Sequence, residues 1–170
     1  GTINGLNRFD GNSFTKYFES STNINGLADN RINDLCVLPG HKLAIATANG
    51  LNFLDTRTGE FSTFRINDST PLSAFSNYFT KLCLDKNGNL WAGTQTELLV
   101  FDPKLKFIHS IRGNYSASDI NRKIIQWVSN IYSLASGEMI VVENDQYVIY
   151  DSKTFRSIKL SEHHESPFAF

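Results

Sequence analysis

Residues 82–94 read LCLDKNGNLWAGT, two short apolar runs joined by a polar turn. The Asn87-Gly88 pair supplies the positive φ that a tight hairpin turn needs. Two further short runs follow at 97–101 and 107–111, separated by Asp102-Pro103-Lys104. Proline suits the first central position of such a turn. The stretch from residue 79 to residue 111 therefore predicts four short antiparallel strands.

The same pattern occurs in two other places. The three units begin at Ile32, Phe79 and Val128, which are 47 and 49 residues apart. Each unit has apolar residues three and eleven positions after its start, and an Asp that follows a large apolar residue and precedes an aromatic one. These recurring residues are Leu35, Leu82 and Ile131; Leu43, Leu90 and Met139; Asp55, Asp102 and Asp151; Phe61, Phe107 and Phe155. Four short strands in a unit of roughly 40–50 residues are typical of a β-propeller blade.

The N-terminus matches only the second half of a unit. Residues 6–10 read LNRFD, like LNFLD at 51–55, and Phe14 and Tyr17 match Phe61 and Phe64. We therefore predict an all-β partial β-propeller of three four-stranded antiparallel blades plus a half blade. Its predicted boundaries are 1–18 for the outer two strands of the half blade, 27–66, 76–112 and 124–160 for the blades, and 161–170 for a tail or the start of a next blade.

Composition and charge argue against several classes of partner. The net charge is −1 and no basic run is present, so a nucleic-acid-binding surface has no electrostatic support. No stretch reaches the roughly 18 apolar residues of a membrane helix, so we expect no direct membrane insertion. No secretion signal opens the chain, and we expect any export or anchoring segment to lie outside it.

Residues 82–94 resemble the two-component regulator propeller repeat, whose core phrase is Leu-Trp-x-Gly-Thr. The resemblance extends over about residues 5–160 and is clearest in the unit that begins at Phe79; Ala44 and Ile140 stand where that unit has Trp91. It implies the periplasmic sensor region of an inner-membrane-anchored hybrid two-component system of the Bacteroidetes type, with a histidine kinase and response regulator elsewhere in the parent protein. It further implies glycan-responsive signal transduction.

Conspicuous single residues have structural explanations. We expect Trp91 to pack between blades, because large aromatic residues supply much of the contact area between sheets. We expect Asp10, Asp55, Asp102 and Asp151 to accept hydrogen bonds from the backbone of the following turns. Cys36 and Cys83 should be free buried thiols, since they fall on separate sheets.

We predict no catalytic residues, no metal site and no cofactor. The loop at 85–89 lacks the glycine and glutamate positions of a calcium loop. The histidines are scattered, without ligand spacing and without a nucleophile nearby. The fragment itself should not be an enzyme.

Candidate ligand contacts come from position in the repeat. Six residues stand just before the first strand of their units, where a propeller has the rim of one face: Asn30, Arg31, Asn77, Tyr78, Gln126 and Trp127. Aromatic, guanidinium and amide groups there would suit an oligosaccharide or a partner loop. An ordinary polar rim is the alternative.

Two other functions stay open at this point. One is a propeller enzyme of the streptogramin-lyase type, and the other is a protein-interaction scaffold. Whichever holds, three and a half blades do not close a ring of four to eight. We therefore expect the chain to be part of a larger propeller and to self-associate through its open ends. The family resemblance implies further contacts with the remaining propeller and sandwich domains of the parent protein.

Overall fold

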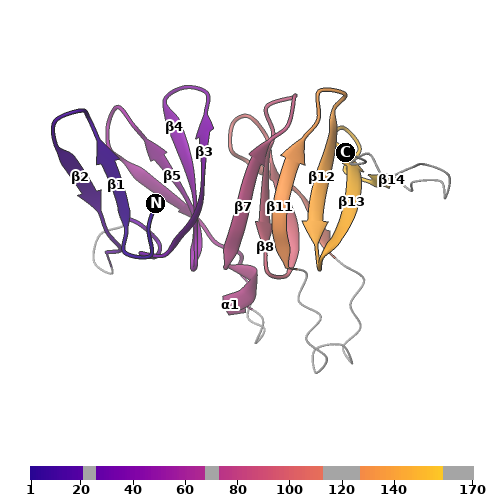
Figure 1. Cartoon of the computed structure of the whole chain (residues 1–170), viewed down its shortest axis with the longest axis horizontal. Coiled ribbons are helices and arrows are strands. Elements are labelled where there is room, and N and C mark those ends of the chain that lie inside the picture. Colours follow the sequence, from indigo (N-terminus) through magenta and orange to yellow (C-terminus); the bar gives the residue numbers. More distant parts are fainter. Residues whose placement is uncertain (21–25, 68–72, 113–126, 159–170) are drawn as a thin grey trace, which may run out of the picture.

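The computed structural model describes residues 1–20, 26–67, 73–112 and 127–158, and consists almost wholly of antiparallel sheets. Figure 1 shows the sheets side by side in chain order, from the indigo N-terminal strands to the yellow C-terminal ones. The predicted fold class, an all-β partial propeller of four-stranded antiparallel blades, is confirmed. The sequence did not predict the single-turn helix α1 (Ser73–Ser76) before the second complete sheet.

Each sheet follows the chain without crossovers. The N-terminal pair is β1 (Leu6–Phe9) and β2 (Phe14–Tyr17). The first complete sheet contains β3 (Ile32–Leu38), β4 (Lys42–Thr47), β5 (Gly50–Asp55) and β6 (Phe61–Phe64). The second contains β7 (Phe79–Leu84), β8 (Leu90–Thr94), β9 (Glu97–Phe101) and β10 (Phe107–Arg112). The third contains β11 (Val128–Ser133), β12 (Glu138–Glu143), β13 (Gln146–Asp151) and β14 (Ser157–Ile158).

The core consists of three apolar layers, each between neighbouring sheets. Between the second and third sheets, Trp91, Leu98 and Val100 pack against a group that includes Val128 and Met139. The layer between the first and second sheets contains Phe53 and Phe101, among other residues. Alternation along each strand sends every second side chain to the other face, so a central strand carries apolar residues on both faces. Each sheet therefore needs a neighbour on both sides.

Gly93 lets two sheets approach closely. A Cβ built on Gly93 would lie 2.5 Å from Cγ1 of Val128, in the first strand of the next sheet. A contact under 3 Å forces a neighbouring group to shift, the β-branched side chain of Val128 is stiff, and overpacking of this kind is destabilising. The short distance between neighbouring blades therefore requires a glycine at this position of the Leu-Trp-x-Gly-Thr phrase.

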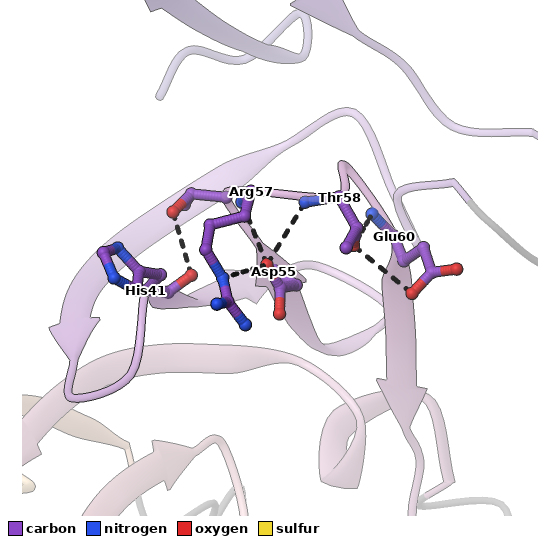
Figure 2. Close-up of polar contacts among 6 residues, drawn as sticks. His41, Asp55, Arg57, Thr58 and Glu60 are labelled. Carbon is purple, nitrogen blue, oxygen red and sulfur yellow. Dashed lines mark hydrogen bonds and ion pairs between the residues drawn. The ribbon is translucent and has the colours of Figure 1, made fainter.

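The four recurring aspartates close turns, as expected. Figure 2 shows Asp55, whose Oδ1 accepts hydrogen bonds from the backbone N–H groups of Arg57 and Thr58 at 2.9 and 3.3 Å. Asp10, Asp102 and Asp151 accept backbone hydrogen bonds in the same way. These backbone donors favour the carboxylate and lower the pKa of Asp10, Asp55 and Asp151.

Asp85 joins a turn to the core. Its Oδ1 accepts from the backbone N–H groups of Asn87 and Asn89, at 2.8 and 2.9 Å. Its Oδ2 accepts from the indole Nε1–H of Trp91 at 3.1 Å. Trp91 is fully buried against Tyr150 of β13 and Phe155 of the turn that follows this strand, which confirms its packing role. The carboxylate therefore satisfies the polar atom of the largest residue in the core.

Cys36 and Cys83 are free thiols on neighbouring inner strands. Both are half-buried, so the prediction of buried thiols holds only in part. Burial, with the nearby Cys83 as a smaller cause, raises the pKa of the Cys36 thiol to about 11, and burial also raises the pKa of Cys83.

Replacing Asp85 with Ala should destabilise the chain by about 2–4 kcal/mol, because the buried indole N–H of Trp91 loses its acceptor and the turn loses two bonds. Urea unfolding followed by tryptophan fluorescence measures the loss. Asp10→Ala is the matched control, since it removes a turn carboxylate that no buried side chain uses, and its effect should be much smaller. Equal losses for the two variants would contradict the role given to Asp85.

The thiol of Cys36 should react slowly with a thiol reagent at neutral pH, because its raised pKa leaves little thiolate there. In a Cys83→Ala chain, where Cys36 alone reports, the reaction rate should keep rising with pH well beyond the ordinary thiol pKa of about 8.5. Urea-unfolded chain should show the ordinary pH dependence. A native profile that levels off near the ordinary value would contradict the assignment.

Candidate functional site

Three residues that precede the inner strands lie in one row. Arg31, Tyr78 and Trp127 directly precede β3, β7 and β11, so the repeat places them at the same end of successive sheets. Backbone bonds fix two of them in the same way: the Arg31 carbonyl accepts from Ala48 N–H, and the Trp127 carbonyl from Asn144 N–H, both at 3.2 Å. The Tyr78 N–H donates to the Phe75 carbonyl at 3.2 Å.

The three side chains contact one another in sequence. The Arg31 guanidinium carbon lies 5.7 Å from the centre of the Tyr78 ring, within the range of a cation–π interaction. The Tyr78 and Trp127 ring centroids are 6.3 Å apart, with 39° between the ring planes. Arg31 is exposed, Tyr78 is half-buried and Trp127 is 47% exposed. We call this set the Arg31–Tyr78–Trp127 row.

Two of the three predicted amide residues have structural contacts. The buried Asn77 donates from Nδ2 to the Ile66 carbonyl at 3.0 Å and accepts from the Ile66 N–H at 2.8 Å, which fixes the chain between two sheets. The Asn30 side chain accepts from the Glu19 N–H at 2.8 Å. Gln126 lies outside the described residues.

The row offers binding chemistry without reactive groups. Flat aromatic faces bury the apolar faces of a ligand, and a guanidinium donates paired hydrogen bonds to carboxylates or sulfates. Arg31 donates its backbone N–H to Asp29 Oδ1 at 2.7 Å, which holds this end of the row in place. The row therefore suits reversible binding of a ring-containing molecule with polar substituents.

Two grooves lie elsewhere in the part of the chain that the structure describes, and neither was expected from the sequence. The first, of about 540 Å³, is lined by Phe53, Phe61 and Phe64 together with Lys42 and Lys104. The second, of about 560 Å³, lies between the N-terminal pair and the first complete sheet. Both arise where sheets diverge, a feature of three-dimensional packing with no recurring sequence signal.

Acidic and thiol groups of the described ranges are dispersed. In those ranges no three His, Cys, Asp or Glu residues lie close enough together to hold a metal ion. Glu143 accepts from the Tyr150 hydroxyl at 2.9 Å, and burial raises the pKa of its carboxyl.

Across the described ranges, no helix has the length and apolar character to cross a membrane.

Part of the chain matches a known family. Residues 73–96, which comprise α1, β7 and β8, match the model of the two-component regulator propeller family. A comparison with curated proteins found no match.

Solved structures share the fold of the chain. The extracellular domain of BT3049, a protein described as a hybrid two-component system of B. thetaiotaomicron, superposes with a TM-score of 0.70 at 23% identity. That match covers 95% of this chain and 22% of the other. Two structures of the extracellular domain of BT4673 from the same organism give TM-scores of 0.61, at 18% and 19% identity. They cover 81% and 83% of this chain, and 17% and 18% of theirs.

The chain thus spans about a fifth of the length of the extracellular domains it resembles. The family match falls on the inner hairpin that contains the Leu-Trp-x-Gly-Thr phrase, and the structural matches extend over most of the chain. Residues 73–96 therefore match the two-component regulator propeller repeat, in a chain that shares its fold with extracellular domains of two-component systems.

Proposed function

We propose that this chain is part of the periplasmic sensor region of an inner-membrane-anchored hybrid two-component regulator, whose histidine kinase lies elsewhere in the protein. In this proposal the propeller recognises an oligosaccharide in glycan-responsive signal transduction. The Arg31–Tyr78–Trp127 row carries the proposal, because it places a guanidinium and two aromatic rings in line on successive sheets.

The spacing of the row fits an extended ligand better than a compact one. Neighbouring members lie 5.7 and 6.3 Å apart, and each belongs to a different sheet, so a bound molecule would cross two blade boundaries. A chain of sugar rings can place one ring against Trp127 or Tyr78 and a charged substituent against Arg31. Acidic oligosaccharides should therefore bind better than neutral ones of the same length.

The Trp127→Ala variant should lose about tenfold in affinity for an oligosaccharide that binds the chain, because exposed tryptophans in binding surfaces supply large contact area. Isothermal calorimetry with matched panels of neutral and uronic-acid-containing oligosaccharides measures the loss. Arg31→Ala should weaken binding of the acidic panel more than of the neutral one.

Tyr147→Ala provides the control, since Tyr147 is also an exposed aromatic residue but lies in β13, two strands outward from β11, the strand that Trp127 precedes. Binding that Tyr147→Ala weakens as much as Trp127→Ala would place the ligand elsewhere. If neither panel binds, the row is not an oligosaccharide site and the interaction-scaffold function is favoured.

The remaining domains of the parent protein are proposed as further partners, and so is a second copy of the isolated chain. Exposed apolar residues lie at both ends of the row of sheets: Leu35 and Val37 near the N-terminal pair, Tyr132 and Ile158 on the last sheet. Apolar surface of this kind favours association.

The isolated chain should therefore show a concentration-dependent mass above that of one chain in multi-angle light scattering. Raising the ionic strength should leave the association intact, because the contact is apolar and the net charge is only −1. A single-chain mass at every concentration tested would refute self-association.

A further inference from the structure

A groove lies between two complete sheets, where the outer part of the first meets the second. Its volume is about 540 Å³, and its lining includes Phe53, which is 9% exposed. One wall is the outer strand β6, of which every residue from Phe61 to Phe64 contributes to the lining. The other wall is formed by Lys104 and Leu105, in the turn between β9 and β10. We call it the β6 groove.

The repeat explains why this boundary between sheets is incompletely filled. At the next boundary the fully buried Trp91 packs against Phe155, with 5.8 Å between the ring centroids. At the boundary beside β6, Ala44 stands in place of Trp91 and Leu105 in place of Phe155. Phe53 is larger than its equivalent Val100 and makes up only part of the lost volume. The β6 groove therefore lies where the next boundary holds two aromatic side chains.

The backbone of the turn shows that the position of Leu105 serves to close a boundary. The φ angles of Leu105 and Phe155 are 65° and 57°, in the left-handed region that favours glycine, and the first complete sheet has Gly59 at this position. In all three turns the N–H of this residue donates at 2.8 Å to the carbonyl of the recurring Asp. Packing offsets the strain, since Leu105 and Phe155 each lie against a core layer. Leu105 is the smaller of the two and leaves the β6 groove open beside it.

The edge of β6 lacks the features that usually prevent another strand from pairing. Edge strands of natural proteins commonly carry charges, prolines or bulges. β10 has a bulge between Phe107 and His109, and β14 has only two residues. β6 reads FSTF, without charge or proline, and pairs with β5 in unbroken register. Within the described ranges β5 is its only partner, so the other edge of β6 can accept a strand.

Lysines from both sheets give the β6 groove a preference for acidic groups. Lys42 and Lys104 line it from the first and second sheets. The ion pair found among the described residues joins Arg57 to Asp55 and involves neither lysine. The acidic side chains of the lining bond within their own turn: Asp55 accepts from backbone N–H groups, and Glu60 accepts from the Thr58 hydroxyl at 3.3 Å (Figure 2).

We propose that the β6 groove binds an extended segment of a partner protein, which adds a strand to the free edge of β6. A Trp, Tyr or Phe side chain of this segment would lie against Phe53, as Trp91 and Phe155 fill the next boundary. Acidic residues two positions away would lie on the same face of the added strand and approach Lys42 and Lys104. In this mode of recognition the main-chain bonds supply affinity and the groove supplies specificity.

The β6 groove is separate from the Arg31–Tyr78–Trp127 row. Lys42 pairs with Leu38, the last residue of β3, whereas Arg31 precedes the first residue of that strand. The two sites therefore lie at opposite ends of the first complete sheet, and variants of one leave the other unchanged.

The probe is a labelled peptide of sequence Thr-Glu-Thr-Trp-Thr-Glu-Thr, which places Trp and both Glu side chains on one face of a strand. The isomer Thr-Thr-Glu-Trp-Glu-Thr-Thr has the same composition but places Trp and Glu on opposite faces. Fluorescence anisotropy should give saturable one-to-one binding of the first peptide to the 170-residue chain. The isomer should bind about fivefold more weakly, and a peptide with Ser in place of Trp about tenfold more weakly.

Matched chain variants locate the binding surface. Lys104→Gln should weaken binding about threefold, whereas Lys106→Gln should not, since Lys106 is an exposed lysine of the same turn outside the groove lining. Leu105→Phe should fill the groove and weaken binding about tenfold. This variant should keep its stability toward urea, because Phe155 already adopts the same backbone conformation in the next sheet.

Hydrogen exchange supplies a readout that does not depend on the variants. The bound peptide should slow exchange at backbone amides of β6 and leave those of β10 unchanged, because only the edge of β6 becomes paired. Absence of binding, equal binding of the isomer, or equal weakening by Lys104→Gln and Lys106→Gln would overturn the proposal. Slowed exchange at β10 without slowed exchange at β6 would overturn it as well.

Discussion

The structure depends on the requirement that each four-stranded sheet be covered on both faces. Central strands such as β8 carry Trp91 toward the third sheet and Leu90 toward the first, and both side chains are fully buried. A sheet with two apolar faces is not stable alone in water, so stability comes from the boundaries between blades as much as from the blades. Gly93 follows from this requirement, since a side chain there would force the second and third sheets apart.

Polar groups at the boundaries set how the sheets align. Apolar contact alone is non-directional and would allow neighbouring sheets to slide past one another. The bonds from Asn33 and Thr80 to carbonyls of the next sheet each connect one defined atom to another. Asp34 adds a bond to the Leu82 N–H at 3.0 Å. The same alignment brings Arg31, Tyr78 and Trp127 into contact, so the spacing of the candidate site is a product of these bonds.

The sequence predicted the features that recur at fixed spacing, because each recurrence reports the same local requirement. The turn aspartates and the position of Arg31, Tyr78 and Trp127 before the inner strands are of this kind. The packing of Trp91 was predicted instead from the size of its side chain. It did not predict that Asp85 would bond the Trp91 indole, since no other unit has both residues. The structural use of Asn77 and the two grooves also went unpredicted, because they depend on distances between sheets.

The inner strand β3 adjoins both the groove beside the N-terminal pair of strands and the candidate ligand row. In a propeller the inner strands are the most crowded part of each blade, so inner positions are covered only when a complete blade stands on both sides. Leu35 lacks that cover while Ile45, further out on the same sheet, is fully buried. Arg31 directly precedes β3, the strand that contains Leu35. The strand that positions Arg31 therefore has less apolar cover at Leu35 than the strands that follow Tyr78 and Trp127 have at Leu82 and Ile131, which are each 8% exposed.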